Sequence, residues 1–597
     1  MTDAALAPQD RPTISIVDIA RRLAFFLVLV ACVAASFDTA VEVWRTGIFF
    51  DSDDAMRAVQ VRDFLAGQGW YDLVAHRYDP PAGVFMHWSR VVDVPVATLE
   101  ALFGLALDPE HAERAARLTF PLLMLVALLW LSARCARVFA GAGASVPALV
   151  MVALSGPMFW QFAPGRIDHH APQIVLLMLV VLAAATGLER PRAFAAAAAG
   201  MAASFAISLE NLPFFVAVLG ILALWFVIEG AAARAALAAF AAGAAIAFPA
   251  AYAATVAPER WMLSACDAFS IVHLVALGVG VSALTLLAAA TPWLATRKRR
   301  AIAVALGGGA VLLAVAAVAP RCLGDPLVDL DPLLRELWLS TLKEAKPLRK
   351  IIAEGAPGVA ATTAGPVALA IVASCGLAVV SRGAARWRWI FLAATIGAGL
   401  AGGLWQVRVF SSTLPLAMTA LAAAATLAAR RLPAHFSPIT RLGLFAALCI
   451  APTPLGVALA LPEDDRPVDF ASSGACRRPQ ALAPLAALPP GRVAGPIELG
   501  PFVLAHTPHS VFAAPYHRGN HGGRLVIDAF LAPPDKAREM LRAAGADYLL
   551  WCAADGKSDL AVRASGSLVA ALTRGAVPAF LERRSPPDSR LMIFALR

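Results

Sequence analysis

Three aspartates, Asp51, Asp53 and Asp54, stand close together directly after the first long apolar segment of the chain. Carboxylates at a membrane boundary are costly unless water, a metal ion or a cationic partner satisfies them. Aspartate in the first turn of a helix also satisfies free N–H groups as a cap. The cluster therefore indicates either a helix cap, the simpler interpretation for Asp51, or acid–base and metal chemistry. The choice depends on which other residues meet it.

A second polar motif, GRIDHH at 165–170, lies between two apolar segments. Asp168 and His170 are two residues apart in an expected turn, so both side chains can point toward one ion. Carboxylate oxygen suits Mg²⁺ or Mn²⁺, and imidazole suits Mn²⁺ better. We therefore predict a divalent-metal site here, with ordinary polar turn residues as the alternative.

Two further polar stretches follow, STLKEAKP at 340–347 and WQVRVFSS around Arg408. Glu344 is either an active-site carboxylate or part of a solvated charged face. Arg408, at the end of an apolar segment, either snorkels to lipid headgroups or binds a phosphate. Together the motifs offer metal ligands, a phosphate-binding arginine and a proton-accepting carboxylate. That set suits transfer of a group from a phosphate-linked lipid.

A membrane domain must position these residues. The 597-residue chain is 59% hydrophobic and 15% charged, whereas soluble domains are about 45–50% apolar and about 25% charged. We predict an α-helical polytopic membrane protein with about thirteen spans. They are expected at 23–45, 115–133, 145–162, 172–188, 193–209, 212–228, 232–256, 271–294, 301–318, 361–380, 389–407, 412–429 and 442–461.

The arginines indicate the topology. If residues 1–22, with Arg21 and Arg22, are cytoplasmic and the first span is a retained anchor, every later arginine cluster between spans falls on the same side. The formal charge of +9 thus reflects membrane topology and not nucleic-acid binding. Segment 91–107 would break this pattern as a span, so we expect an interfacial helix there.

With this topology, all four polar motifs lie on the outer face. They fall in the external loops 46–114 and 319–360, in the turn 163–171, and at the outer end of one span. A multi-pass transporter, the less favoured class, would instead hold its polar residues near the bilayer midplane on broken helices.

Residues 462–597 are polar enough to form an extracytoplasmic α/β domain after the transmembrane domain 23–461. Apolar runs alternate with helix-like segments. The expected strands are Phe502–Leu504, Tyr548–Trp551 and Leu591–Leu596, and the expected helices are Lys536–Ala544 and Ser567–Arg574. Cys476 and Cys552 can pair if this part is extracytoplasmic. The eight cysteines form no CxxC pair, so no zinc or redox motif is indicated.

The order and spacing of the motifs resemble the catalytic subunit of oligosaccharyltransferase and, more broadly, the GT-C superfamily of polyprenyl-phosphate-dependent glycosyltransferases. FDSDDAMRAVQVRDFLAGQGWYD resembles the first external loop of that family, GRIDHH its second acidic motif, and STLKEAKP the motif of its long mobile loop. The resemblance implies a GT-C-like fold and an active-site role for Glu344. It implies that Asp53, Asp168 and His170 bind Mn²⁺ or Mg²⁺, and that Arg408 binds the donor phosphate. Asp53 is the implied acceptor-activating base, with Asp54 as its close competitor.

The acceptor side departs from the family pattern. The family opens its soluble domain with Trp-Trp-Asp-Tyr-Gly, whereas the nearest counterpart here is GPIELG at 495–500, followed by a histidine-rich segment. We therefore expect Glu498 and His517 to contact an acceptor, although loop histidines are the simpler reading. The acceptor is a saccharide, a lipid or a protein.

The resemblance implies metal-dependent, inverting transfer of a sugar or glycan from a polyprenyl-(pyro)phosphate. The expected location is the periplasmic face of a bacterial inner membrane. A polysaccharide ligase or a lipid-modifying transferase with the same donor chemistry is the alternative.

Overall fold

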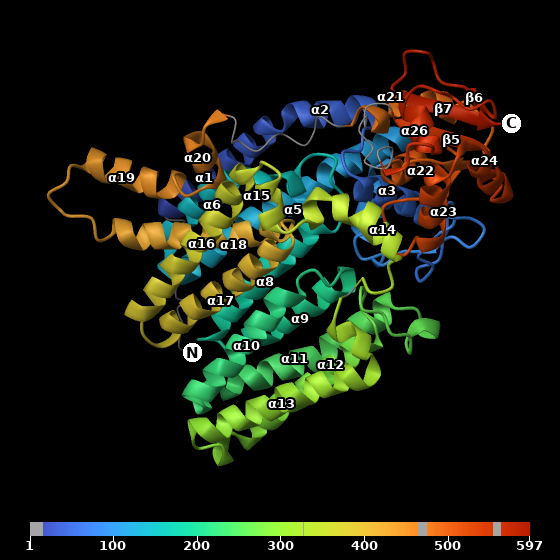
Figure 1. Ribbon diagram of the computed structural model, residues 1–597. Coiled ribbons are helices and arrows are strands. Elements are labelled where there is room, and N and C mark those ends of the chain that lie inside the picture. Colours follow the sequence, from blue (N-terminus) through green and yellow to red (C-terminus); the bar gives the residue numbers. More distant parts are fainter. Residues whose placement is uncertain (1–15, 326, 464–473, 553–562) are drawn as a thin grey trace, which may run out of the picture.

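The computed structural model describes residues 16–325, 327–463, 474–552 and 563–597, so the first fifteen residues of the predicted cytoplasmic N-terminus lie outside it. A bundle of long helices carries a mixed α/β domain at one end (Figure 1). Among the described residues, nine helices are long and apolar enough to cross a membrane, or up to twelve if each bent pair is one span. The predicted polytopic membrane fold is confirmed.

The nine single spans are α5 (Pro109–Ala140), α8 (His170–Gly187), α10 (Leu212–Glu229), α11 (Ala231–Thr255), α12 (Ile271–Ala290), α13 (Arg297–Val318), α16 (Pro357–Val380), α17 (Gly383–Trp405) and α18 (Val409–Ala429). The three bent pairs are α1 (Ile16–Ala35) with α2 (Phe37–Thr46), α6 (Ser145–Ala153) with α7 (Gly156–Phe159), and α19 (Pro438–Ile450) with α20 (Pro454–Ala460). They bend by 53°, 76° and 95°.

The predicted span 193–209 is shorter than expected. It forms α9 (Ala193–Ile207), which has 15 residues and rises only about 22 Å, less than the roughly 30 Å hydrocarbon core. The helix ends because Ser208 adopts an extended conformation. Thirteen predicted spans therefore become at most twelve by length, with α9 packed between α8 and α11.

The loop after α2 contains α3 (Ser52–Leu65), a hairpin of β1 (Val74–Ala75) and β2 (Val84–Phe85), and α4 (Asp93–Phe103). With 11 residues, α4 is too short to cross a bilayer and packs against α5 and α3. The expected non-spanning helix at 91–107 is therefore present. The second long loop, between α13 and α16, contains the short helices α14 (Pro332–Leu337) and α15 (Leu348–Ala353).

The C-terminal part forms a five-stranded sheet in the order β4-β3-β5-β7-β6. Strands β3 (Arg492–Ala494), β4 (Ser510–Val511) and β5 (Tyr548–Cys552) are parallel, and β7 (Leu591–Leu596) runs antiparallel to β5 and β6 (Leu581–Arg583). Helices α21 (Pro479–Ala486), α22 (Gly500–His506), α23 (Asn520–Leu531), α24 (Pro534–Ala543) and α26 (Leu568–Thr573) flank the sheet.

Two of the three predicted strands and both predicted helices are present. The predicted strand at Phe502–Leu504 is wrong: these residues lie in α22. The run is buried on all sides, and a short, fully apolar run has no periodicity that separates a strand from a buried helix. The Cys476–Cys552 disulfide is formed, and a second bridge joins Cys266 to Cys322.

The loop after α2 and the C-terminal residues share one hydrophobic core. Phe49, Val59 and Trp88 belong to the same buried cluster as Phe502 and Ile593. The Arg77 side chain donates hydrogen bonds to the carbonyl oxygens of residues 504, 507 and 509 at 2.7–3.1 Å, and α22 packs against α3. The C-terminal part is thereby fixed over the loop that carries the aspartates.

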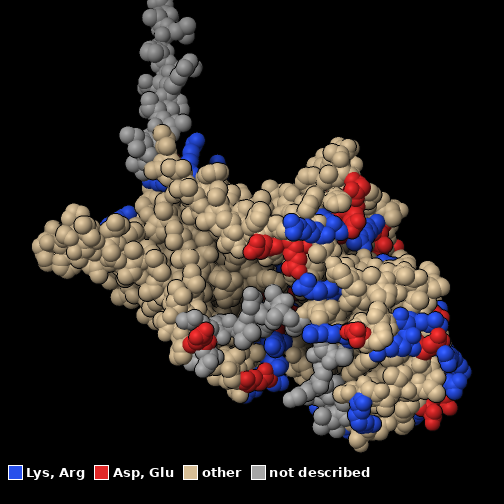
Figure 2. Space-filling view, turned by 90° about the horizontal axis from the view of Figure 1, so that it is seen from above, with Lys and Arg blue, Asp and Glu red and all other residues tan. Residues whose placement is uncertain are grey.

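Charged side chains are unevenly distributed over the surface. In Figure 2, lysines, arginines and acidic residues gather over the C-terminal part and around the hollow beside it, while the helices on the opposite side show few. Such separation is expected when one part lies in lipid and the other in water.

Candidate active site

The aspartate cluster lies at the beginning of α3. Asp51 is the N-cap, and its side chain accepts a hydrogen bond of 2.9 Å from the N–H of Asp53, so the expected capping role of Asp51 is confirmed. Asp54, fully buried, accepts hydrogen bonds from the N–H groups of Ile167 (2.7 Å) and Asp168 (3.1 Å). The two acidic motifs predicted from the sequence are therefore in direct contact.

Arg166 joins these motifs. Its buried guanidinium forms ion pairs with Asp51 (2.9 Å), Asp54 (3.0 Å) and Asp168. Burial alone would raise the pKa of Asp168, but Arg166 outweighs it and holds that pKa below its usual range. Burial and the neighbouring carboxylates raise the pKa of Asp54 to about 7, against the opposing effect of Arg166. One cation thus holds three carboxylates in place.

Asp53, unlike Asp51, Asp54 and Asp168, is not paired with Arg166. It forms no ion pair with any described residue, and burial followed by the charges of Asp51, Asp168 and Glu344 raises its pKa well above the usual value. The Tyr516 hydroxyl lies beside this carboxylate and donates to the carbonyl oxygen of Ser52 at 3.1 Å. A carboxylate in this setting is suited to bind a cation or to accept a proton.

Two adjacent histidines and a glutamate lie next to Asp168. His170 Nδ1 is 3.1 Å from Asp168 Oδ2. Glu210 Oε1 lies 3.4 Å from His169 Nε2 and 3.8 Å from His170 Nε2. One ligand atom from each of His169, His170 and Glu210 lies within 4.8 Å of the others. Two imidazoles and a carboxylate suit Mn²⁺ or a later transition metal better than Mg²⁺.

Sequence reasoning missed Arg166, His169, Glu210 and Tyr516. Of these four residues, Glu210 was the easiest to find from the sequence. It is the acidic residue between the predicted spans 193–209 and 212–228, in a turn that the arginine pattern assigns to the outer face. The role of Arg166 depends on contacts across more than a hundred residues, which one sequence does not reveal.

The third and fourth motifs lie side by side. The N–H of Arg408 donates to the carbonyl oxygen of Glu344, and the N–H of Val407 to that of Lys346, each at 3.1 Å. The Arg408 guanidinium is 37% exposed and lies 3.7 Å from Glu210 Oε1. Glu344, Arg408 and the histidines therefore belong to one site.

The two expected acceptor residues occupy different surroundings. Glu498 accepts a hydrogen bond of 2.9 Å from Trp338 Nε1. Burial raises its pKa, Arg477 and the Trp338 hydrogen bond oppose this, and the charges of Asp51 and Glu344, close enough to act on it, raise it as well. His517 pairs instead with Asp267 at 2.6 Å, in the turn between α11 and α12. Its ring lies 4.8 Å from that of His87.

The overall structure matches solved structures of the oligosaccharyltransferase AglB from Archaeoglobus fulgidus. The complex with an inhibitory peptide and a dolichol-phosphate aligns with a TM-score of 0.65 at 13% identity, covering 97% of this chain and 74% of that chain. The chain has a GT-C-like fold. The AglB complex with Zn and sulfate aligns with a TM-score of 0.61 at 14% identity, covering 96% of this chain and 73% of that chain.

ArnT from Cupriavidus metallidurans aligns with a TM-score of only 0.39 at 14% identity, over 96% of this chain and 98% of that chain. Neither the protein-family models nor the curated protein sequences give a match.

Proposed function

We propose that this GT-C-like protein is a glycosyltransferase that moves a sugar or glycan from a polyprenyl-(pyro)phosphate to an acceptor. One observation supports the proposal: Asp53, the Asp168–His170 turn, Glu344 and Arg408 come from four distant segments and lie near one another. The charges of Asp168, His170 and Glu344 act on Asp53, Glu344 contacts Arg408 through the backbone, and His170 and Arg408 both lie beside Glu210. Carboxylates, imidazoles and a guanidinium at one end of a membrane bundle are the groups that transfer from a lipid phosphate requires.

Arg408 would bind the donor phosphate. Its side chain lies at the start of α18 and is partly exposed, and a guanidinium can bind phosphate oxygens bidentately. Glu210 would keep the guanidinium directed at the site until the phosphate arrives. A dolichol-phosphate is present in one AglB complex of similar fold.

A divalent cation, Mn²⁺ or Mg²⁺, would be held by Asp53, Asp168 and His170, with His169 and Glu210 next to it. Asp53 forms no ion pair with a described residue that would compete with a cation, and Asp168 lies beside His170. His170 also belongs to the group His169, His170 and Glu210, whose ligand atoms lie within 4.8 Å of one another. When bound, the cation would stabilise the charge of the departing phosphate.

Asp53 would orient the acceptor and accept its proton. Glu344, carried by the loop between α13 and α16, would help to position the acceptor nucleophile for attack opposite the phosphate, which implies inversion at the anomeric carbon. Asp54 remains a competing candidate for the base, but its oxygens already bind the 167–168 backbone and Arg166. We therefore assign it the positioning of the second motif.

The acceptor would meet the site from the C-terminal part, near Glu498 and His517. Both are proposed acceptor contacts, and Tyr516, which precedes His517 in the chain, has its hydroxyl beside Asp53. The chain has no Trp-Trp-Asp-Tyr-Gly motif, so the acceptor class covers a saccharide, a lipid or a protein. A polysaccharide ligase and a lipid-modifying transferase are both included.

The cysteines support an oxidising compartment on the site's side of the membrane. Both disulfides lie in loops or in the C-terminal part, whereas the four free cysteines lie in membrane helices or bent helix pairs. Disulfides persist in oxidising compartments. We infer that the site faces the periplasm of a bacterial inner membrane.

The test is an assay of transfer from lipid-linked sugars extracted from membranes, using purified full-length protein. Asp53→Ala, Asp168→Ala and Glu344→Ala should each reduce the rate by about 100-fold or more. Glu259→Gln, an exposed carboxylate in the turn after α11, serves as the control and should leave the rate unchanged. Full activity in all three alanine variants would refute the assignment.

A further inference from the structure

A basic cavity lies at the opposite end of the bundle from the candidate active site. It has a volume of about 470 Å³ and lies between α5, the end of α8 and the start of α17. Thr186, in its wall, follows His170 by four and a half turns of α8, about 24 Å along the axis. The cavity and the active site are therefore separated by most of the thickness of a bilayer.

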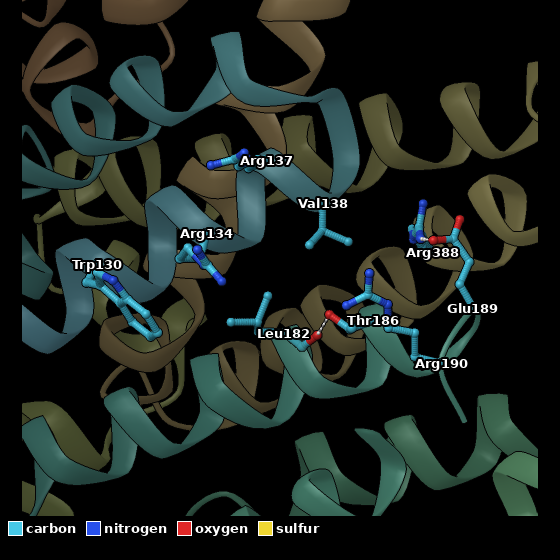
Figure 3. Close-up of a pocket in the computed structure, with 9 residues that line it drawn as sticks. All are labelled: Trp130, Arg134, Arg137, Val138, Leu182, Thr186, Glu189, Arg190 and Arg388. Carbon is cyan, nitrogen blue, oxygen red and sulfur yellow. Dashed lines mark hydrogen bonds and ion pairs between the residues drawn. The ribbon is translucent and has the colours of Figure 1, made fainter. Parts of the chain in front are cut away.

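Four arginines line this cavity, and their charges are incompletely neutralised. Arg388 pairs with Glu189 at 2.7 Å and donates to the carbonyl oxygen of Ala185 at 3.1 Å. Arg134, Arg137 and Arg190 form no ion pair with any described residue. Figure 3 shows Arg134 from α5 and Arg190 from the segment after α8 around the same open space. Four positive charges and one negative charge thus face one cavity.

The side of the cavity that continues toward the bilayer is apolar. Trp130 is 51% exposed, and the Arg134 guanidinium lies 5.4 Å from its ring centroid. Leu123, 48% exposed, is one heptad before Trp130 on the same face of α5. An exposed tryptophan between apolar residues and arginines is typical of the membrane–water boundary.

We propose that this cavity binds the headgroup of an anionic phospholipid, whose acyl chain lies along Leu123 and Trp130 on α5. The arginines would donate hydrogen bonds to the phosphate, and basic cavities between membrane helices are suited to such headgroups. The positive-inside rule accounts for arginines at the ends of membrane helices but not for the grouping of four arginines around one cavity. The basic cluster at Arg297–Arg300, at the beginning of α13, lines none of the described cavities.

The test is lipid binding to the full chain in detergent, measured by native mass spectrometry with phosphatidylglycerol and with phosphatidylcholine. Wild type should bind phosphatidylglycerol at least about 10-fold more tightly, because this lipid carries a net negative charge, whereas the choline cation of phosphatidylcholine neutralises its phosphate. The variant Arg134→Gln/Arg137→Gln/Arg190→Gln should lose about 10-fold or more of that affinity. It retains the Arg388–Glu189 pair that links α8 to α17.

The matched control is Arg297→Gln/Lys298→Gln/Arg299→Gln, which removes the same charge from the exposed cluster on α13 and should leave binding unchanged. Glycerol 1-phosphate should compete poorly because it lacks the acyl chain. Three outcomes would overturn the proposal: equal binding by the cavity variant and wild type, an equal loss in the control, or displacement of the lipid by glycerol 1-phosphate at equal concentration. If the triple variant does not fold, Arg134→Gln and Arg190→Gln are measured singly, with a loss of about 3-fold expected for each.

Discussion

The backbone N–H of Arg408 donates a hydrogen bond of 3.1 Å to the carbonyl oxygen of Glu344. The contact is main chain to main chain, so it survives replacement of either side chain. It holds the loop between α13 and α16 against the junction of α17 and α18. Variants at these two positions therefore change the charges of the site without removing the bond that places the loop.

Arg408→Gln should weaken use of the lipid-linked donor. Loss of a charge-assisted hydrogen bond costs about 1.5–3 kcal/mol, so kcat/KM for the donor should fall by about 10- to 100-fold. Arg408→Lys, which keeps the charge but not the bidentate geometry, should fall in between. Arg349→Gln, exposed in α15 of the loop between α13 and α16, is the control. Equal donor kinetics for Arg408→Gln and the control would exclude a phosphate-binding role.

Arg166→Leu should destabilise the protein. It leaves the buried Asp54 and Asp168, and the partly exposed Asp51, without their shared cation, and leaving buried charges unpaired costs about 3–5 kcal/mol of unfolding free energy. Adding Asp54→Asn should recover part of that loss because one unpaired carboxylate is removed. Thermal unfolding in detergent measures both effects, with the exposed Arg441→Leu as control. A Tm for Arg166→Leu equal to that of the control would contradict the triple ion pair.

Metal binding should depend on the histidine turn and on Glu210. His170→Ala and Glu210→Gln should each lower Mn²⁺ affinity by about 10-fold or more, measured as bound metal after equilibrium dialysis, independently of activity. His521→Ala, which removes an exposed histidine paired with Asp79, is the control. Chelation of the wild type should abolish transfer, and Mn²⁺ should restore it. Unchanged metal content in both site variants would argue against this ligand set.

Acid should destabilise the protein partly through His506. Burial, together with the nearby charges of Arg62 and Arg117, lowers the pKa of His506 from 6.5 to about 4. As pH falls below 6.5 the unfolded chain takes up a proton that the folded chain does not, so stability is lost between pH 6.5 and pH 4. This residue alone should cost about 2 kcal/mol between pH 7 and pH 5.

His506→Gln should reduce the acid-induced fall in Tm, while the exposed His435→Gln should follow the wild type. A variant whose Tm falls with pH as steeply as that of the wild type would show that His506 does not carry this dependence.

Much of the candidate site follows from residue type and topology. Aspartate, histidine and arginine at the ends of apolar segments are costly, so their positions indicate function, and the arginine pattern places them on one face. The acidic motifs at Asp53 and Asp168 could therefore be joined from sequence alone. Whether Asp53 or Asp54 faces the site depends on the first turn of α3, which the sequence does not specify.

The parts that could not be predicted depend on packing. The buried run Phe502–Leu504 has no alternation or helical periodicity that would identify its secondary structure. It lies in α22, and its burial results from packing against α3, which the sequence does not show. In the sequence, Arg166 is an ordinary turn residue. Its role is clear only from the structure, in which it pairs with Asp51, Asp54 and Asp168. The shortness of α9 likewise depends on the extended Ser208 and not on composition.

The contact between the Tyr516 hydroxyl and the carbonyl oxygen of Ser52 has a consequence for biosynthesis. Ser52 is synthesised when about a tenth of this sequence has been translated, whereas Tyr516 follows all the candidate membrane spans among the described residues. The aspartates are thus synthesised long before the segment that covers them. A nascent chain that stalls after α20 would therefore hold the aspartates of α3 without Tyr516 or the rest of the surface that packs over them.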